Sequence, residues 1–434
     1  MSGDESRIDV HDSPWAILRF RDYRRFLTGN LLALFASQMQ TTVVGWELYQ
    51  RAGRPLELGL VGLAQLLPIL LLAIPAGHIA DRFERRKVVM IATFLFSLSS
   101  LGLMLVSLWE ADLRWYYPLL FLGGVARSFN QPAKGALLPT LVPPAAFARA
   151  VTWNTSGFQL ATILGPALGG FLVTLVKPAW IYLLDALLTL TFIGFLLTMP
   201  RREAAAAREP LTWRSLLGGV EFVWKTKIIL GALALDMFAV LLGGATALLP
   251  IYARDILQVD AQGLGWLRGA PGVGALVMSV LLTHLPPIRR AGWTLLWSVA
   301  GFGIATIIFG LTRNFWLATA MLFLTGALDM ISVIIRHTLV QISTPNEMRG
   351  RVSAVNTVFI SVSNELGAAE SGLVAQLFDR PGDAAFGPTI SVVSGGIGTI
   401  LVTALTALYF PTLRRRDHLD PVADQEEQKT NDGM

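Results

Sequence analysis

The residues in this sequence that are best suited to chemistry are acidic and basic side chains inside long apolar runs. Asp329 and Arg336 are seven residues apart in one such run, so a helix would carry both on one face, two turns from each other. Ionisable side chains inside a membrane are costly to bury and usually mark a substrate or proton pathway. A carboxyl group that alternates between a dry site and a site beside a cation can load and release a proton. The chemistry that this pattern predicts is proton transfer.

The charged residues of these runs give a candidate proton-coupling set, with the acids as proton carriers and the arginines as counter-charges or substrate contacts. The set consists of Asp329, Glu365, Glu370, Arg127 and Arg336. Glu365 and Glu370 are separated by about 140° around a helix, so the two cannot face one partner. A static ion pair that fixes helix packing is the competing interpretation of any single member. Asp185 and Glu47 lie nearer the ends of their runs, where we expect a structural cap and a static pair.

A second group of polar and aromatic residues in the same runs is suited to lining a cavity for an amphiphilic substrate. Its members are Gln38, Trp46, Asn130, Asp236, Trp266, Arg268 and Asn356. Ordinary hydrogen bonds between helices explain the amides of this group equally well.

The composition requires that these residues be positioned by membrane-spanning elements. Of the 434 residues, 53% are hydrophobic and only 15% are charged, and the mean hydropathy is +0.55. A soluble domain carries about 25% charged residues. The absence of cysteine excludes disulfides and thiolate metal sites. We find no HExxH, GxSxG or Walker A sequence, which argues against a membrane enzyme. No loop is long enough for a nucleotide-binding domain, which argues against an ATP-driven pump.

Twelve runs are long enough to cross the hydrocarbon core, which takes about 20 residues of helix. They span residues 26–50, 58–80, 87–109, 115–138, 149–175, 179–199, 228–253, 262–284, 293–311, 315–343, 351–378 and 386–411. Lys and Arg gather in the connections on one side, and this bias predicts that both termini are cytoplasmic. It also explains the net charge of +5 without nucleic acid as a partner. The polar start of the chain does not have the pattern of a secretory signal.

The longest polar connection divides the runs into six and six, a common plan of secondary transporters. Its second part, 211–224, is amphipathic and is expected to lie along the membrane surface. The predicted domains are a cytoplasmic arm (1–25), an N-terminal six-helix half (26–199), a cytoplasmic linker (200–227), a C-terminal six-helix half (228–411) and a disordered tail (412–434).

A dense charge cluster, GHIADRFERRKV at 77–88, lies between the second and third runs. Positive charge there is typical of a cytoplasmic turn, but that rule counts only Lys and Arg and leaves Asp81 unexplained. A carboxylate at this position can meet the positive N-terminal end of a partner helix.

This cluster resembles the signature of the major facilitator superfamily between its second and third helices. Gly77, Asp81, Arg82, Arg85, Arg86 and Lys87 match the signature, and Glu84 stands where the family usually has glycine. GPALGG in the fifth run (Gly165, Pro166, Gly169 and Gly170) is similar to the motif that the family's antiporters carry there. The segment from DMISVIIRH to SNELGAAESG is similar to the branch that includes the enterobactin exporter and macrolide-efflux-like proteins.

The resemblance implies an all-α membrane protein with twelve transmembrane helices in two six-helix halves. It also implies a latch in which Asp81 meets the start of the eleventh helix near Arg351 and holds the cytoplasmic side closed. The implied function is export of a small amphiphile, such as a drug-like compound or a siderophore, by alternating access in exchange for protons. An uptake symporter or a lysophospholipid flippase of the same fold, and a non-transporting membrane receptor or enzyme, are the alternatives.

The expected partners follow from this function. They are a small-molecule substrate, protons or another coupling ion, and membrane lipids, with no nucleic acid, no cofactor and no metal. We expect a monomer in the bacterial plasma (inner) membrane.

Overall fold

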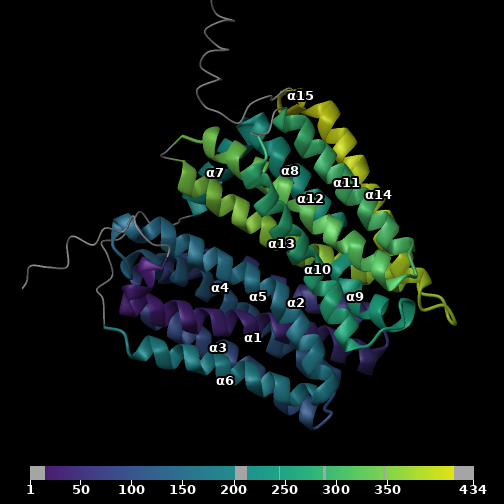
Figure 1. Cartoon of the computed structure of the whole chain (residues 1–434), viewed down its shortest axis with the longest axis horizontal. Coiled ribbons are helices and arrows are strands. Elements are labelled where there is room, and N and C mark those ends of the chain that lie inside the picture. Colours follow the sequence, from purple (N-terminus) through teal and green to yellow (C-terminus); the bar gives the residue numbers. More distant parts are fainter. Residues whose placement is uncertain (1–14, 201–212, 244, 287–289, 346–347, 415–434) are drawn as a thin grey trace, which may run out of the picture. The chain divides into compact units, whose positions relative to one another are not determined.

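The computed structural model describes residues 15–200, 213–243, 245–286, 290–345 and 348–414. Across these residues the chain is helical, and the one pairing outside helices is an isolated bridge between Arg380 and Asp383 (Figure 1). The predicted N-terminal arm up to residue 14, most of the charged part of the linker and the predicted tail from residue 415 lie outside the described residues.

Packing divides the chain into two compact units. One comprises residues 1–43 and 71–210, and the other comprises 44–70 and 211–434. Helices α1 (Arg21–Ala52) and α2 (Pro55–Arg82) therefore contribute to both units. The predicted boundaries of the two six-helix halves remain a prediction, because this division follows packing rather than membrane topology.

The first unit is built from four further helices besides its parts of α1 and α2. They are α3 (Arg85–Leu108), α4 (Tyr116–Leu137), α5 (Phe147–Leu175) and α6 (Pro178–Leu197). Helix α3 packs against both α4 and α6. A buried apolar cluster that includes Phe26, Val89 and Phe192 joins α1, α3 and α6.

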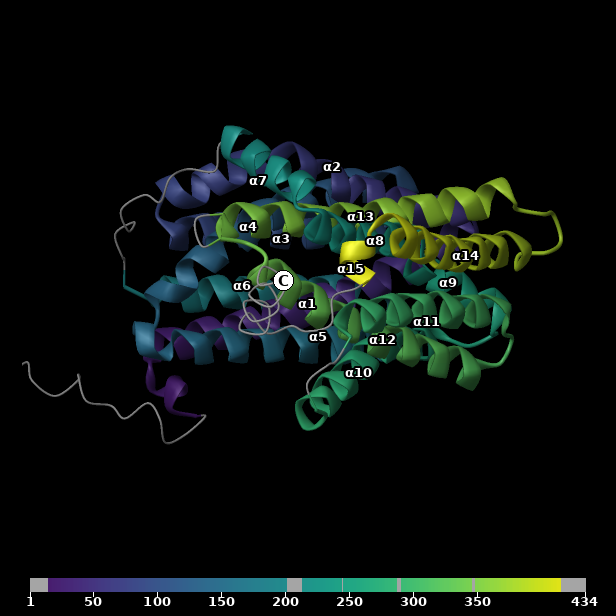
Figure 2. The same ribbon diagram turned by 90° about the horizontal axis from the view of Figure 1, so that it is seen from above.

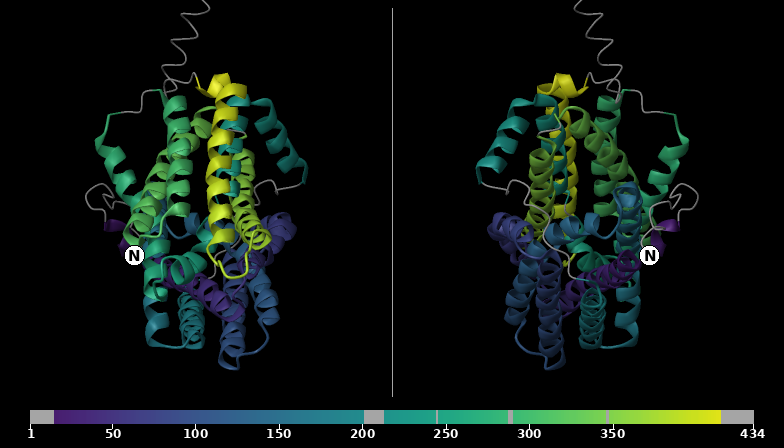
Figure 3. Two further views of the ribbon diagram at one scale, coloured as in Figure 1. Left: turned by 90° about the vertical axis from the view of Figure 1, so that its right-hand side faces the viewer. Right: turned by 90° about the vertical axis from the view of Figure 1, so that its left-hand side faces the viewer.

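The second unit contains the remaining helices. They are α7 (Trp213–Lys225), α8 (Lys227–Leu242), α9 (Leu249–Ile251), α10 (Ala261–His284), α11 (Ala291–Leu311), α12 (Phe315–Ile342), α13 (Arg349–Leu377), α14 (Phe386–Tyr409) and α15 (Pro411–Arg414). Figures 2 and 3 show α11, α12 and α14 running side by side, and α12 also packs on α10. Helix α13 packs on α8, α14 and the linker helix α7.

The predicted fold class is confirmed: the chain is an all-α membrane protein. Each of the twelve predicted runs coincides with a helix or, for the seventh, with a series of helical segments. Among the described residues, nine helices are long and apolar enough to cross a membrane by length and composition. Helices α1, α4 and α13 are not among these nine, because polar and charged residues interrupt them. This count is consistent with twelve spans.

The surface of the helices is suited to lipid. On α3, the large apolar side chains of Ile91, Phe94 and Leu98 recur at helical spacing and are 46–62% exposed. Exposed stripes of this kind suit acyl chains better than water. The described backbone of these spans is hydrogen-bonded within the helices, as hydrocarbon requires.

The seventh span departs from the single helix predicted over 228–253. Helix α8 ends at Leu242 with Gly243 as its C-cap, and the chain continues through a 3₁₀ turn (η5, Ala245–Leu248), α9 and a π-helical turn (η6, Tyr252–Ile256). Glycine weakens a helix, and Pro250 at the start of α9 has no N–H that could donate to a carbonyl of the preceding turn. The π-helical turn changes the direction of the side chains that follow, including Arg254 and Asp255.

Candidate functional site

A buried ion pair joins α8 and α12 in the second unit. The guanidinium of Arg336 contacts the carboxylate of Asp236, and the two residues are 3% and 8% exposed. Loss of either partner would leave the other charge buried and uncompensated, which is costly in a dry interior. The pair therefore holds the two helices in one register.

Two more titratable residues surround this pair. Asp329, two turns before Arg336 on α12, is close enough to interact electrostatically with both Asp236 and Arg336. His337 interacts with the same two residues. We call Asp236, Asp329, Arg336 and His337 the α8–α12 cluster. It contains two carboxyl groups for one permanent cation, so one proton can be gained or lost while the ion pair stays formed.

The other predicted coupling residues lie elsewhere. Arg127 on α4 donates to the Ser37 hydroxyl of α1 at 3.4 Å. Glu370 on α13 accepts a long hydrogen bond of 3.5 Å from Ser371. The backbone carbonyl of Glu365 lies against Gly62, where a Cβ would be 2.7 Å from it. The structure therefore joins Asp329 and Arg336 with Asp236, which the sequence placed among the cavity candidates.

Arg268 on α10 forms no ion pair with any residue that the structure describes. Its Nε is buried and, among the described residues, finds no hydrogen-bond acceptor. The guanidinium lies over Gly45 of α1, whose missing side chain leaves room for it: a Cβ there would be 3.0 Å from Nη2 and 3.3 Å from Pro250. The residue as a whole is half-buried. A guanidinium without a carboxylate partner in a membrane protein is suited to binding an anionic group.

The remaining cavity candidates are held in different ways. Gln38 donates to Thr162 at 2.9 Å, and Asn130 donates to Thr93 at 3.0 Å. Asn356 is 7% exposed, and its Oδ1 has no partner among the described residues. Trp46 is buried, whereas Trp266 is 58% exposed. A role for these residues in substrate binding stays a prediction.

The antiporter-like motif forms a close contact between α5 and α1. A Cβ on Gly165 would meet the Cβ of Gln38, and one on Gly169 would lie 2.9 Å from the Met39 carbonyl oxygen. Pro166 and Gly170 are buried in the same stretch, and α5 continues through Pro166. Small residues here allow the two backbones to approach closely, as is usual between membrane helices.

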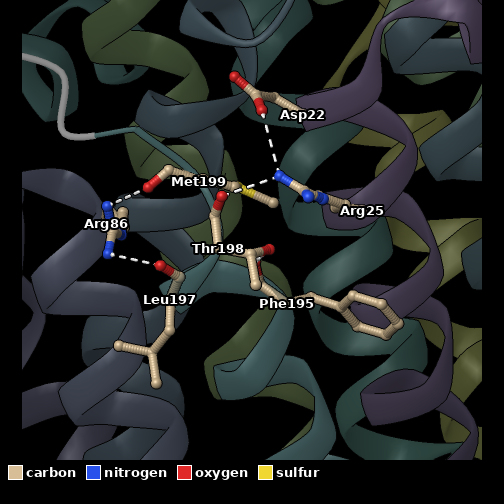
Figure 4. Close-up of polar contacts among 7 residues, drawn as sticks. All are labelled: Asp22, Arg25, Arg86, Phe195, Leu197, Thr198 and Met199. Carbon is tan, nitrogen blue, oxygen red and sulfur yellow. Dashed lines mark hydrogen bonds and ion pairs between the residues drawn. The ribbon is translucent and has the colours of Figure 1, made fainter.

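The basic residues of the charge cluster bind the ends of neighbouring helices. Arg86 donates to the carbonyls of Met199 and Leu197 at the end of α6, and Arg25 of α1 donates to the Thr198 carbonyl at 2.8 Å (Figure 4). These carbonyls lack helical donors and carry the negative end of the helix dipole. Sequence reasoning missed this role, because Arg86 and Arg25 lie 111–173 residues from the carbonyls that they bind and only packing brings them to the end of α6.

The other members of the cluster are placed as follows. Arg85 donates to the Ala136 carbonyl of α4 at 3.0 Å, and Lys87 pairs with Glu84 at 3.1 Å. Gly77 is buried and Arg82 is exposed, whereas the side chain of Asp81 lies outside the described residues. The latch stays a prediction.

Arg351, the predicted partner of the latch, begins α13 near the linker helix. Its carbonyl lies against Gly219 of α7, where a Cβ would be 3.0 Å away. The amphipathic segment predicted around 211–224 is therefore a helix packed on α13 over its described part.

Sequence reasoning also missed a clasp between α1 and the π-helical turn. The Tyr49 hydroxyl donates to the Asp255 carboxylate, and Arg254 donates to the Tyr49 carbonyl at 3.3 Å. The Arg254 guanidinium also lies 5.6 Å from the centre of the Tyr49 ring. The signal was present, because Tyr49 lies at the end of the first run and Arg254 and Asp255 directly follow the seventh, which places all three at one side of the membrane. We call Tyr49, Arg254 and Asp255 the α1–η6 clasp.

No group of three or more acidic or histidine side chains that could hold a metal ion occurs within the described part of the chain.

Comparison with known proteins extends over nearly the whole chain. The sequence pattern of the family described as "Transmembrane secretion effector" matches residues 12–427. The chain is 28% identical over 340 residues to the "Enterobactin exporter EntS" of Shigella boydii serotype 18, which is 78% of this chain and 80% of that protein. The EntS protein of Escherichia coli O1:K1 / APEC matches to the same extent.

Two solved transporters show the same fold. A bacterial homolog of the human lysosomal transporter Spinster, inward-facing and unoccupied, superposes with a TM-score of 0.70 at 14% identity, covering 91% of this chain and 97% of that one. The nucleoside transporter NupG superposes with a TM-score of 0.67 at 13% identity, covering 91% and 100%. At these identities the likeness concerns the fold alone.

Proposed function

The chain belongs to the transmembrane secretion effector family of the major facilitator superfamily, and from this premise we propose that it exports a small amphiphile in exchange for protons. It is an integral membrane efflux transporter and not an enzyme. Proton coupling, the substrate class and the direction of the termini are the parts that we propose.

The observation that carries proton coupling is the α8–α12 cluster. Arg336 is permanently charged and is paired with Asp236, so Asp329 is the carboxyl that gains or loses the proton. A small movement between α8 and α12 exchanges the partner of Arg336 from one carboxyl to the other. When Arg336 turns from Asp236 to Asp329, Asp329 releases its proton, and Asp236, left in a dry site without its counter-charge, binds one, so the proton site moves from α12 to α8 and the number of bound protons stays the same. This exchange links a proton to the relative position of two helices.

The substrate is an amphiphile of drug-like or siderophore size. Arg268 supports this part of the proposal, because its uncompensated charge would orient a polar or anionic group while apolar side chains contact the remainder. The names of the curated relatives, which are enterobactin exporters, also favour a siderophore-like substrate.

Alternating access accounts for the motif at 77–88. Asp81, at the last turn of α2, would meet the start of α13 near Arg351 and hold the cytoplasmic side closed. The proposed location is the bacterial inner membrane with both termini in the cytoplasm, where the basic connections belong.

Proton flux in inverted membrane vesicles tests the proposal. The lumen is acidified, and a pH-sensitive dye reports proton efflux while siderophores, macrolides and cationic amphiphiles are added in turn. We expect one class to release protons, and we expect Asp329→Asn to abolish the release. Glu221→Gln is the matched control, because Glu221 lies on α7 outside the spans and is paired with Lys225 at 2.6 Å.

Two results would contradict the proposal. Unchanged substrate-driven proton release in Asp329→Asn would remove this residue as the carrier. No release with any compound would favour the uptake symporter or the lysophospholipid flippase, and radiolabelled lysophospholipid would be added next to separate these two.

A further inference from the structure

Asp185, in the middle of α6, is a buried carboxyl that the proposed cycle does not use. The residue is 0% exposed. We expected a structural cap, but the N-cap of α6 is Lys177, and Asp185 lies two turns further along the helix. Its Oδ2 is 2.5 Å from the Ser100 hydroxyl of α3. Its Oδ1 has no hydrogen-bond partner among the described residues.

The partners of Ser100 indicate which group carries the proton. The Ser100 oxygen accepts from Gln40 Nε2 of α1 at 2.8 Å and lies 3.1 Å from the Phe96 carbonyl oxygen. A hydroxyl has one proton to donate and two lone pairs to accept with. It therefore cannot donate to both the Phe96 carbonyl and the Asp185 carboxyl.

An ionised Asp185 would satisfy these contacts poorly. Ser100 would have to give its proton to the carboxylate and leave the Phe96 carbonyl with its helical bond alone. The carboxylate would receive one short hydrogen bond, from Ser100. Thr189, one turn further along α6, also lies near the carboxyl group, but its hydroxyl donates to the Asp185 backbone carbonyl at 2.7 Å, so Oδ1 would be buried without a hydrogen-bond partner among the described residues. A buried charge with so little compensation is strongly disfavoured.

A neutral Asp185 satisfies all of them. The acid donates from Oδ2 to the Ser100 oxygen, Ser100 donates to the Phe96 carbonyl, and Gln40 donates into the second lone pair of Ser100. The remaining Oδ1 is then an uncharged carbonyl oxygen, which is less costly to leave without a partner. The geometry thus favours a carboxylic acid that holds its proton.

The charged surroundings of Asp185 are sparse. Among the described residues, Arg127 of α4 is the charged group whose field acts on it, and no ion pair joins the two. The contacts from α3 and α1 are neutral: Ser100, with Ser97 binding the neighbouring Ala186 carbonyl, and Gln40 behind Ser100. Arg127 is thus the natural counter-charge once the proton has left.

We propose that Asp185 is a second proton-binding site, neutral in this arrangement, whose protonation is tied to the position of α1 through Ser100 and Gln40. When α1 moves and withdraws Gln40, water reaches Ser100 and Asp185 and accepts the proton. The ionised Asp185 carboxylate then turns to Arg127. Gln40 is two residues from Gln38, which contacts Gly165 of the antiporter-like motif, so the same part of α1 contacts both α3 and α5. The use of this proton in transport rests on the proposed export function, whereas its presence on Asp185 does not.

Infrared spectroscopy of the full-length protein in lipid tests the protonation directly. A neutral carboxylic acid has a C=O stretching band above the amide region, and a carboxylate does not. We expect the difference between wild type and Asp185→Asn at neutral pH to show the loss of one such band. The matched control is Glu221→Gln, which should remove a carboxylate signal instead, since Lys225 holds the pKa of this exposed residue below its usual range.

A second variant keeps the test valid if Asp185→Asn does not fold. Ser100→Ala removes the hydrogen-bond partner but keeps the acid, so the same band should shift rather than disappear. A carboxylate signal lost in Asp185→Asn, or no response of any neutral-acid band to Ser100→Ala, would overturn the site.

The link to α1 has its own readout. Addition of a transported substrate, or of a proton gradient, should change the Asp185 band in wild type and leave it unchanged in Gln40→Leu. If the Asp185 band responds to substrate in the same way in wild type and in Gln40→Leu, the coupling to α1 is wrong, whereas Asp185 remains a proton-binding site. Failure of the export proposal would appear separately, as absence of substrate-driven proton flux in wild type.

Discussion

Tyr49, near the end of α1, donates a hydrogen bond to Asp255 in the π-helical turn that completes the broken seventh span. Arg254 binds the Tyr49 carbonyl and lies near its ring, so the end of α1 is held by two consecutive residues of η6. A straight seventh helix would direct these side chains differently, and the break in the helix therefore makes the clasp possible.

Tyr49→Phe should loosen the α1–η6 clasp. The change removes one hydrogen bond to a charged group, worth about 1.5–3 kcal/mol, and leaves Asp255 with Arg254 at 3.6 Å. We expect faster hydrogen–deuterium exchange over 252–256, with little change elsewhere. Tyr409→Phe is the matched control, because Tyr409 is 75% exposed. Equal exchange rates in wild type and Tyr49→Phe would show that the hydroxyl does not hold the turn.

Asp236→Asn should destabilise the protein, because it leaves the buried charge of Arg336 without the carboxylate of Asp236. Arg336 is 3% exposed, and removal of one partner of a buried ion pair costs about 3–5 kcal/mol where no second counter-charge is near. Asp329 can take over part of the pairing, so we expect a loss at or below the lower end of that range. Thermal unfolding in detergent measures the loss. The double variant Asp236→Leu with Arg336→Met should recover much of it, because no unpaired charge remains. A double variant as unstable as the single one would mean that packing, and not charge, holds α8 to α12.

Arg268→Gln should change which substrates are exported. The guanidinium has no carboxylate partner among the described residues. Its removal therefore leaves no buried carboxylate without a counter-charge, and the protein should still fold. A hydrogen bond to a charged group contributes about 1.5–3 kcal/mol, which corresponds to about 10-fold or more in affinity. Export of anionic amphiphiles should fall by that factor, and export of uncharged ones should not. An equal loss for both classes would indicate a structural role instead.

Gly169→Ala should separate α5 from α1. The new Cβ would lie 2.9 Å from the carbonyl oxygen of Met39 and 3.0 Å from its Cα, and backbone atoms cannot move aside cheaply. Overpacking of this kind costs about 1–3 kcal/mol, which should appear as a lower melting temperature. Gly194→Ala on α6 is the control, because a Cβ there meets nothing within 4 Å. This control should unfold at the same or a higher temperature, since alanine favours a helix over glycine.

The sequence by itself determined the helices. The run predicted at 315–343 is α12 at Phe315–Ile342, and the run at 179–199 is α6 at Pro178–Leu197. This agreement has a physical cause: a segment in hydrocarbon must satisfy its own backbone hydrogen bonds, so apolar length alone defines it. Gly243, Gly244 and Pro250 are sequence signals for a break in the seventh span. Whether they break the helix depends on whether neighbouring helices support a continuous helix there.

Only the tertiary structure decided which side chains meet. The seven-residue spacing of Asp329 and Arg336 placed them on one face of α12, but Arg336 forms its ion pair with Asp236 of α8. Asp185 was expected to cap a helix, and packing of α6 on α3 placed it against Ser100 instead. The position of a polar residue along its span predicts its depth in the membrane. Its interaction partner depends on how two helices are rotated and packed against each other. Those are set by the close fit of glycines and apolar side chains along whole helices, which no local spacing encodes.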